Sequence, residues 1–434
     1  MFTYYLDLAL RSLKRNKVLT GLMVLAIGLG IGASITTLTV LRLLSGDPLP
    51  GKSAMLFYPQ VDPTNRGGDE PQSQMTYVDA VNLWRAHRAD RQAIVVSAQV
   101  KVFGPQADAR PMGLSTVATN ADFFPMFDVP FARGGPWTAA DGAAKARVAV
   151  ISQALNDRLF AGGDGVGRSI RLDRWDFRVV GVLGRWRPTP RFYDLYGGGA
   201  FAAGDDVFIP FETSRDLAEL GIQGNGLDCW GKLGDVLHLE NQPCLWLQYW
   251  VQLDTPARLR DYRDFLVSYS RQQKELGRYT YKDRPKVALR SLTEWLDYNG
   301  VVPSDVRLQT WVAFGFLLVC LLNTVGLLLA KFLRRSAEVG VRRALGASRR
   351  AVFAQFLVEA GVVGLAGGVL GLLLALSGLW AVRRTPSDYA SLAHLDAGMF
   401  LATLVLAIAA SLLAGLLPAW RACQVPPALQ LKSQ

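Results

Sequence analysis

Four stretches of this sequence contain no charged residue and are long enough to cross a lipid bilayer. They run from Val18 to Leu41, Leu308 to Ala330, Ala360 to Val382 and Ala397 to Trp420, and contain 24, 23, 23 and 24 residues. A helix needs roughly 20 apolar residues to cross a hydrocarbon core of about 30 Å. The first stretch also exceeds the roughly 7 to 15 apolar residues of a cleaved signal peptide, so we expect it to remain as a span. The sequence therefore predicts a membrane protein with four transmembrane helices.

Basic residues near the ends of these stretches indicate how the chain crosses the membrane. The chain has 47 Lys and Arg against 36 Asp and Glu, a net charge of +11. Residues 1–17, 331–350 and 420–434 together hold 13 basic and two acidic residues, which accounts for the whole excess. Basic residues near span ends mark the cytoplasmic side, so we expect these segments and both termini there. The charge thus reflects membrane orientation, and no nucleic-acid partner is implied.

The expected architecture is one span, a large external insertion and three further spans. The segments are a cytoplasmic N-terminal segment (1–17), transmembrane helix 1 (18–44), an external domain (45–307), transmembrane helix 2 (308–332), a cytoplasmic connecting helix (333–350), transmembrane helix 3 (351–382), an external loop (383–396), transmembrane helix 4 (397–420) and a cytoplasmic tail (421–434).

The external insertion has the pattern of an α+β domain. A buried strand is expected at 146–151, followed by a helix at 153–160 and a hairpin of 169–172 with 175–182. Further strands are expected at 206–210 and 249–253, with a helix from Pro256 to about Leu276. Residues 187–242 are rich in Gly, which predicts an irregular or mobile insertion there.

Two cysteines are expected on the external side. Cys229 and Cys244 would close a loop of about fifteen residues if they form a disulfide, which stabilises by roughly 3 kcal/mol. A metal site with His238 is the alternative, but these three residues lack a fourth ligand and fit no common zinc spacing. The sequence thus favours the disulfide and predicts no metal site.

One segment matches a nucleotide-binding motif. Gly46 to Ser53 reads GDPLPGKS and fits G-x-x-x-x-G-K-[ST]. The phosphate-binding loop requires a strand before it and a helix after it, whereas here an apolar span precedes it and Pro48 and Pro50 stiffen the loop. We therefore expect a loop leaving the bilayer. The three histidines have no acid or nucleophile at a suggestive spacing, so no catalytic residue and no cofactor is predicted.

Small residues in the spans predict close helix packing. Pairs of glycines four residues apart allow two helix backbones to approach closely. The candidates are Gly28, Gly32, Gly364, Gly368 and Gly371, with Gly367 paired to Gly371. Glu359, at the margin of the third span, is expected either to pair with a cytoplasmic base or to take part in ion transport.

The connection between the second and third spans has a pattern that the positive-inside rule does not explain. Residues 331–350 read KFLRRSAEVGVRRALGASRR, which predicts a short helix with Val339, Val341, Ala344 and Leu345 as its apolar positions. Glu338 and Arg342 are four residues apart, a spacing that stabilises a helix by about 0.2 to 0.5 kcal/mol. Gly346 is placed to end the helix.

This connection carries a family resemblance. The run EVGVRRALGAS at 338–348, followed by QFLVEA at 355–360 and a Gly-rich span, resembles the permease subunits of MacB/FtsX/LolC-type ABC transporters. The first span and its basic approach, the tail PAWRA at 418–422 with Pro426 to Leu429, and external residues 118–131 and 148–167 are similar to the same family, although Gln430 stands where an Arg is common. The likeness is weak at 187–242.

The resemblance implies a mechanotransmission protein of the bacterial inner membrane with a periplasmic MacB-like core domain. The connecting helix is expected to dock on a cytoplasmic ABC ATPase dimer, a separate polypeptide that binds ATP and Mg. The implied partners also include a second permease, identical or not, and in some members a periplasmic adaptor and an outer-membrane channel. The expected coupling residues are Glu338, Val339, Gly340, Arg342, Arg343, Leu345, Gly346 and Ala347.

Two functions are compatible with this resemblance. The first is a transport permease that drives export or extraction of a substrate in efflux or envelope transport. The second is an FtsX-like scaffold that controls a periplasmic cell-wall enzyme. The large external domain favours the first, since scaffold members tend to have smaller ones.

Overall fold

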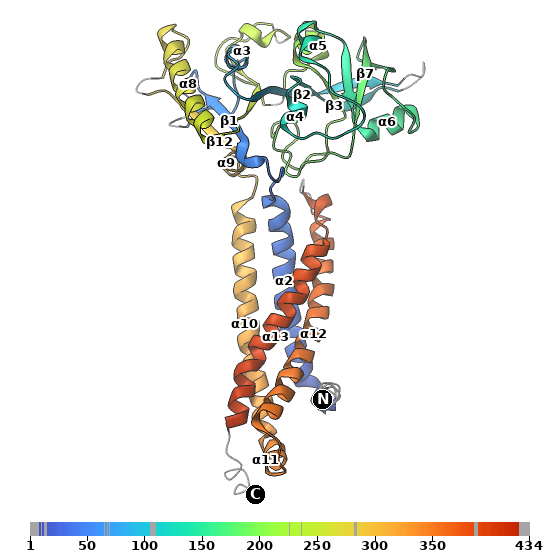
Figure 1. Ribbon diagram of the computed structural model, residues 1–434, viewed down its shortest axis with the longest axis vertical. Coiled ribbons are helices and arrows are strands. Elements are labelled where there is room, and N and C mark those ends of the chain that lie inside the picture. Colours follow the sequence, from blue (N-terminus) through green and yellow to red (C-terminus); the bar gives the residue numbers. More distant parts are fainter. Residues whose placement is uncertain are drawn as a thin grey trace. The chain divides into compact units, whose positions relative to one another are not determined.

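The protein consists of two compact units. A computed structural model describes residues 8–424, apart from residues 10, 13–14, 65, 67, 69, 105–109, 225, 236, 282–283 and 386–388. One unit combines Met1–Ser45 with Val302–Gln434, and the other is Gly46–Val301. The family-like ending at 426–430 lies outside the described residues. The elements of both units are labelled in Figure 1.

The first unit is a bundle of long apolar helices. These are α2 (Lys17–Ser45), α10 (Ser304–Arg334), α12 (Arg349–Val382) and α13 (Ala397–Gln424). In the described part of the chain, these four are long and apolar enough to cross a membrane, with hydropathy of 2.2 to 2.5. The short helix α11 (Ser336–Ala344) joins α10 to α12, and a single turn, η4 (Ala390–Leu392), lies between α12 and α13. The predicted arrangement of one span, an insertion and three spans is confirmed.

Helix α12 packs through glycines on two of its faces. Added Cβ atoms at Gly367 and Gly371 would lie 2.6 and 2.8 Å from side-chain atoms of Ile27 and Ile31 on α2. On the face toward α13, added Cβ atoms at Gly364 and Gly368 would lie 1.8 and 2.5 Å from Ser411 and Ala407. Such distances leave no room for a side chain, so the backbones themselves are in close approach.

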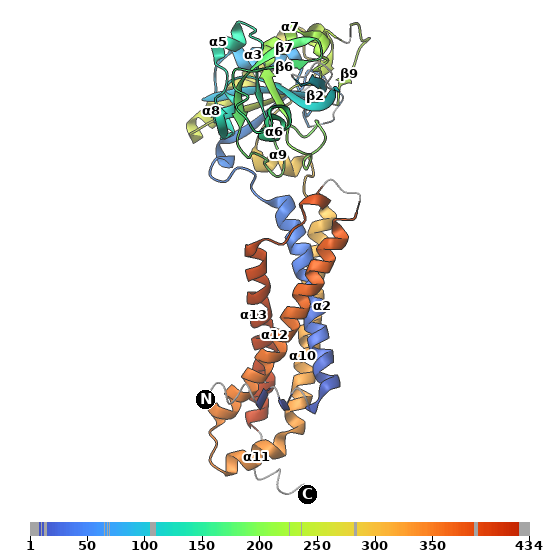
Figure 2. The same ribbon diagram turned by 90° about the vertical axis from the view of Figure 1, so that its right-hand side faces the viewer.

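The two candidate glycines of α2 complete this contact. An added Cβ at Gly28 would lie 2.8 Å from Leu370, and one at Gly32 would lie 2.7 Å from Leu374. The structure therefore places every packing glycine named from the sequence at a helix crossing that involves α12. Figure 2 shows α12 running beside α2 and α13 in this bundle.

The second unit is built on a mixed β-sheet. In the described residues its strand order is β12-β1-β11-β2-β3-β8-β5-β7-β4, with β6 pairing with β2 and β7. The pairs β3–β8 and β5–β7 are parallel, and the other pairs are antiparallel. The strands are β1 (Leu56–Val61), β2 (Arg91–Phe103), β3 (Met112–Thr119), β4 (Phe131–Gly134), β5 (Val148–Ile151), β6 (Ser169–Leu172), β7 (Trp175–Leu183), β8 (Val207–Pro210), β11 (Gln248–Gln252) and β12 (Val287–Ser291).

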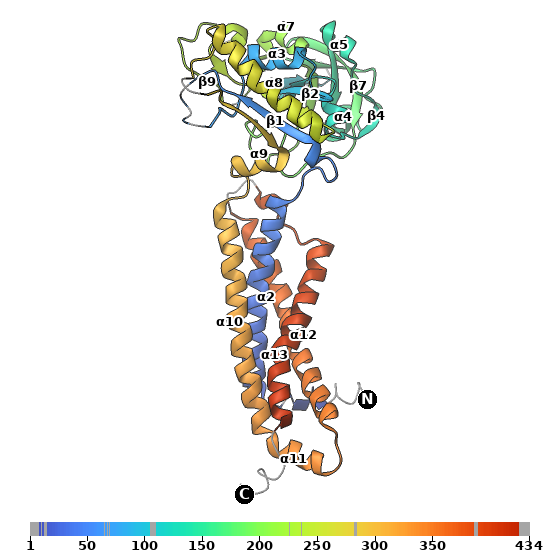
Figure 3. The ribbon, with the colours of Figure 1, turned by 60° about the vertical axis from the view of Figure 1, so that its left-hand side comes forward.

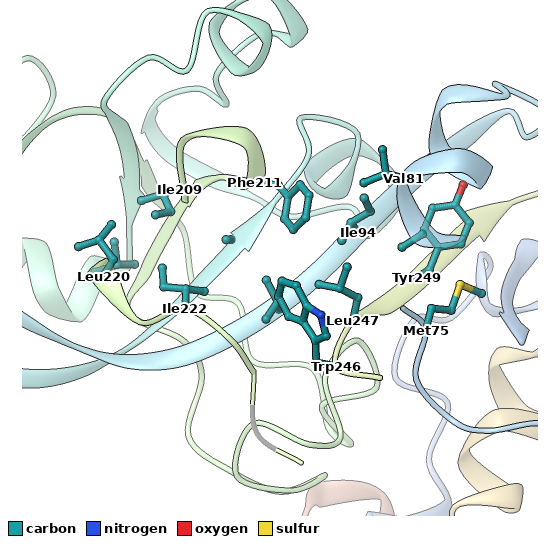
Figure 4. Packing of buried hydrophobic residues seen from close by; sticks show 14 of the residues in the cluster. Met75, Val81, Ile94, Ile209, Phe211, Leu220, Ile222, Trp246, Leu247 and Tyr249 are labelled. Atoms are coloured by element: carbon teal, nitrogen blue, oxygen red, sulfur yellow. The ribbon is translucent and has the colours of Figure 1, made fainter. Parts of the chain in front are cut away.

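Helices pack against this sheet and enclose its core. They are α3 (Tyr77–Arg85), α4 (Phe123–Met126), α5 (Ala139–Ala143), α6 (Gln153–Phe160), α7 (Phe211–Asp216), α8 (Pro256–Glu275) and α9 (Leu292–Tyr298). The Ser152 and Thr255 hydroxyls accept hydrogen bonds from the backbone amides of Leu155 and Arg258. These bonds cap the N-termini of α6 and α8. Figure 4 shows part of the core, with Ile94, Phe211 and Trp246 among its buried residues.

The segment 187–242, expected to be an irregular or mobile insertion, contributes a regular strand and a buried ion cluster. Strand β8 lies inside the sheet, between β3 and β5. Arg191 is buried, and its guanidinium lies 2.6 Å from Asp194 and 3.2 Å from Asp205. Burial raises the pKa of Asp205, against the opposing effect of Arg191. The Gly and charge content resembles an exposed loop, but Arg191, Asp194 and Asp205 pair with one another inside the domain, so this part of the segment is packed into it.

The two external cysteines lie in a small separate ladder. Strands β9 (Asp228–Cys229) and β10 (Cys244–Leu245) pair with Cys229 directly opposite Cys244. The two sulfurs are bonded as a disulfide. His238 is exposed and faces Asp235 and Glu240. No group of three or more His, Cys, Asp and Glu among the described residues is arranged to hold a metal ion.

The glycine contacts predict a position-specific effect of a single methyl group. We expect Gly364→Ala to lower the free energy of unfolding by about 1 to 3 kcal/mol, because its Cβ would overlap Ser411. Gly361→Ala is the matched control on the same helix, because nothing lies within 4 Å of an added Cβ there. Thermal unfolding of the full chain in detergent measures both. Equal unfolding temperatures for the two variants would contradict close packing of α12 on α13.

Candidate functional site

Helix α11 is set off from its neighbours by specific end structures. Arg335 lies between α10 and α11 and interrupts the helical path. At the other end, Gly346 has φ of +99°, a conformation that favours glycine. The amides of Gly346 and Ala347 donate to the carbonyls of Arg343 and Arg342 at 3.1 and 3.0 Å, which is a Schellman motif. The sequence thus fixes both ends of α11, and Figure 3 shows it at the end of the helix bundle.

One face of α11 is tied to the bundle by charged side chains. Glu338 accepts from Arg335 at 3.1 Å and from Arg342 at 3.0 Å. Arg342 also donates to the side chain of Gln355 on α12 at 3.0 Å. The hydrogen bond from Arg335 lowers the pKa of Glu338, so this carboxylate stays charged. Four side chains therefore link α11 to α12 and to the junction with α10.

A buried ion cluster lies behind this face. The Glu359 carboxylate is 1% exposed and lies 2.6 Å from Lys331 Nζ and 3.1 Å from an Arg335 guanidinium nitrogen. The Ser12 hydroxyl donates to the same carboxylate. Lys331 belongs to α10, Glu359 to α12, and Ser12 precedes α2. Three separate parts of the chain thus share one buried negative charge.

Two apolar side chains beside these ion pairs are exposed. Val341 and Leu345 are one helical turn apart, and they are 56% and 82% exposed. Val339 and Ala347, in contrast, pack against the apolar core of the bundle, and Gly340 is buried. An exposed pair of apolar side chains on a short helix is typical of a contact with another protein.

The expected coupling residues therefore do not share one environment. Glu338, Val339, Gly340 and Arg342 face the bundle, Gly346 and Ala347 form the turn, and Leu345 faces away from the bundle. Arg343 is half-buried. The expected set does not contain Val341, although its apolar spacing with Leu345 is visible in the sequence. Lys331, Ser12 and Gln355 are also absent from it, because their partners are distant in sequence.

The structure gives the phosphate-loop motif a different role. Lys52 Nζ lies 2.6 Å from Asp128 and donates to the carbonyl oxygen of Pro125 at 2.6 Å. Only a single turn, Ser53–Met55, follows before strand β1 begins. The lysine is thus engaged within its own domain, and the helix that would hold phosphate groups does not follow the motif.

Comparison with known proteins shows the family of this chain. A family described as the MacB-like periplasmic core domain matches residues 20–264, and the FtsX-like permease C-terminal family matches residues 311–427. The first match alone covers more than half of the chain. This chain belongs to the MacB/FtsX-like family of ABC transporter permeases. The resemblance inferred from residues 338–360 is thereby confirmed.

Curated relatives extend along nearly the whole chain. It is 26% identical over 432 residues to the macrolide export ATP-binding/permease protein MacB of Azoarcus sp., covering 98% of this chain and 59% of that protein. It is 22% identical over 307 residues to the uncharacterized ABC transporter permease YvrN of Bacillus subtilis, covering 70% and 67%. The chain thus spans about 59% of the length of MacB-type relatives.

One solved structure aligns with part of this chain. The periplasmic region of MacB from Actinobacillus actinomycetemcomitans aligns with 59% of this chain and 97% of its own length, at 12% identity and a TM-score of 0.37.

The buried cluster predicts a large effect of one charge. Glu359→Gln leaves Lys331 and Arg335 without their shared carboxylate, and we expect the free energy of unfolding to fall by about 3 to 5 kcal/mol. Lys331→Met combined with Glu359→Gln removes both buried charges and is expected to recover part of this loss. Thermal unfolding of the full chain in detergent measures each variant.

An exposed carboxylate provides the control for this prediction. Glu275 is exposed at the end of α8, so Glu275→Gln is expected to change stability by less than about 0.5 kcal/mol. If Glu359→Gln unfolds at the same temperature as the wild type, the cluster does not hold the bundle together.

Proposed function

We propose that this chain is the permease subunit of an ABC transporter. In this proposal a separate cytoplasmic ATPase hydrolyses ATP, and the resulting motion passes through the spans to the periplasmic domain and drives export or extraction of a substrate. The chain lies in the bacterial inner membrane with both termini and α11 in the cytoplasm, as the basic excess at residues 1–17, 331–350 and 420–434 favours.

The combination of fixed and exposed side chains on α11 carries this proposal. A helix that transmits force needs some side chains fixed to the moving part and others free to bind the source of motion. The contacts of Glu338 with Arg335 and of Arg342 with Gln355 provide the first. The exposed side chains of Val341 and Leu345 provide the second. The partner for these exposed side chains is an ATPase dimer, which binds the ATP and Mg.

The connections of α11 provide a route for the motion. It is linked directly to α10 and α12, and α12 packs closely on α2 through glycines. Helices α2 and α10 are the two that continue covalently into Gly46–Val301, the inserted unit. In the proposal, a displacement of α11 therefore reaches the ends of α2 and α10 that lead into the inserted unit through packed helices.

The chain itself has no catalytic part in this proposal. The spans transmit motion to the periplasmic domain. This domain moves the substrate together with a second permease, an adaptor and an outer-membrane channel where these are present. The MacB-type relatives are named for macrolide export, which supports export as the class of activity for this chain.

Charge introduced on the exposed face of α11 tests the proposal. We expect Val341→Glu with Leu345→Glu to abolish co-purification of the ATPase from host membranes, because a carboxylate replaces each exposed apolar contact. Bound ATPase is identified by mass spectrometry and by ATP hydrolysis in the purified complex. Arg342 is less suitable for this test, because it also holds Gln355 and Glu338.

A second exposed leucine provides the matched control. Leu276 is 67% exposed at the end of α8, in the other unit. Leu276→Glu is expected to leave co-purification at the wild-type level. If Val341→Glu with Leu345→Glu retains the ATPase, α11 is not its docking surface.

A further inference from the structure

A cavity lies beside α11, where the segment before α2 meets the end of α10. Its volume is about 560 Å³, and its lining includes Arg11, Arg15, Asn16, Arg334, Arg335 and Glu338. Ligand-binding pockets commonly measure about 300 to 1,000 Å³. The cavity is therefore large enough for a small polar group and is lined by four guanidinium groups and one carboxylate.

The lining carries more positive charge than the protein neutralises. Glu338 is engaged by Arg335 and Arg342, and Arg335 also contacts Glu359. Arg15 and Arg334 make no hydrogen bond or ion pair within the described part of the chain, and both are exposed. The positive-inside rule explains why basic residues occur at this end of the bundle. It does not explain why four arginines from two separate segments line one cavity.

The position of the cavity along the helices corresponds to the polar surface of a bilayer. The apolar stretch of α2 begins at Val18, and that of α10 ends at Ala330. The lining residues at 11–16 and 334–338 lie immediately outside these two stretches. Residues directly flanking a hydrocarbon-spanning segment lie at the depth of the lipid headgroups.

We propose that this cavity binds the phosphate group of an anionic phospholipid headgroup. Guanidinium groups match phosphate oxygens through paired N–H donors, and basic pockets between spans bind lipid headgroups of this kind. Arg15 and Arg334 bind the phosphate, and Asn16 offers an amide to the glycerol hydroxyls. Glu338 lies in the cavity wall, so an occupied cavity contacts the helix that we propose to dock the ATPase.

Native mass spectrometry of the full chain in detergent tests this site. The probes are phosphatidylglycerol and phosphatidylcholine of equal acyl length, added separately. We expect wild-type protein to retain phosphatidylglycerol preferentially. Arg15→Gln with Arg334→Gln is expected to weaken its binding about thirtyfold, or about fivefold for each basic residue removed.

A matched pair of basic residues outside the cavity serves as control. Arg350 and Arg421 are exposed and do not line it. Arg350→Gln with Arg421→Gln makes the same change in net charge and is expected to retain phosphatidylglycerol. Equal weakening in the two double variants, or no preference in the wild type, overturns the proposal. Arg15→Lys with Arg334→Lys keeps the charge and is expected to retain part of the binding, which separates loss of the site from misfolding.

A third probe distinguishes a lipid headgroup from a free anion. If inorganic phosphate binds with the same dependence on Arg15 and Arg334 while phosphatidylglycerol shows no preference over phosphatidylcholine, the lipid proposal is wrong and the ligand is a soluble phosphate. All these measurements use the chain without an ATPase. Loss of ATPase docking and loss of lipid binding are therefore separate results.

Discussion

The helix bundle depends on one buried carboxylate. Glu359 lies on α12, where burial of an unpaired charge costs several kcal/mol, and it is compensated by Lys331 of α10 and by Arg335 at the start of α11. The Ser12 hydroxyl adds a further contact from the segment before α2. Because these partners come from three parts of the chain, compensation of the charge requires them to assemble. The stacked rings of Phe332 and Phe356 fill the apolar space on the same two helices.

Close helix contacts connect this ion cluster with the rest of the bundle. Helix α12 has glycines toward both α2 and α13. Side chains of both neighbouring helices therefore contact the α12 backbone directly. Contacts of this kind have little freedom to slide, since a shift brings side chains into positions where no space exists. The ion cluster and the glycine crossings thus act in series: the first attaches α11 to α12, and the second attaches α12 to α2.

Local pattern was sufficient to predict the four long helices, α11 and several elements in the second half of the inserted unit, whereas β1 to β4 and contacts between distant residues were not predicted. Hydropathy gave the four long helices, and strands bounded by turn residues gave the β6–β7 hairpin, because both signals lie within a few consecutive residues. Lys331 looked like one more exposed base, yet its side chain is fully buried beside Glu359, 28 residues further along the chain. Arg191 was likewise misleading within a Gly-rich segment, since its partners Asp194 and Asp205 compensate its charge inside the domain.

The basic excess of the sequence includes two kinds of residue with different roles. Lys331 and Arg335 neutralise Glu359, and Arg342 pairs with Glu338, so these cations contribute to the structure of the bundle and α11. Arg15 and Arg334 have no such partner among the described residues, and they face a cavity beside the same helix. A rule based on charge counting treats both kinds alike, because each marks the same side of the membrane. Their contacts separate them: the first kind holds α11 in place, and the second is available to an anion whose binding acts on α11 through Glu338.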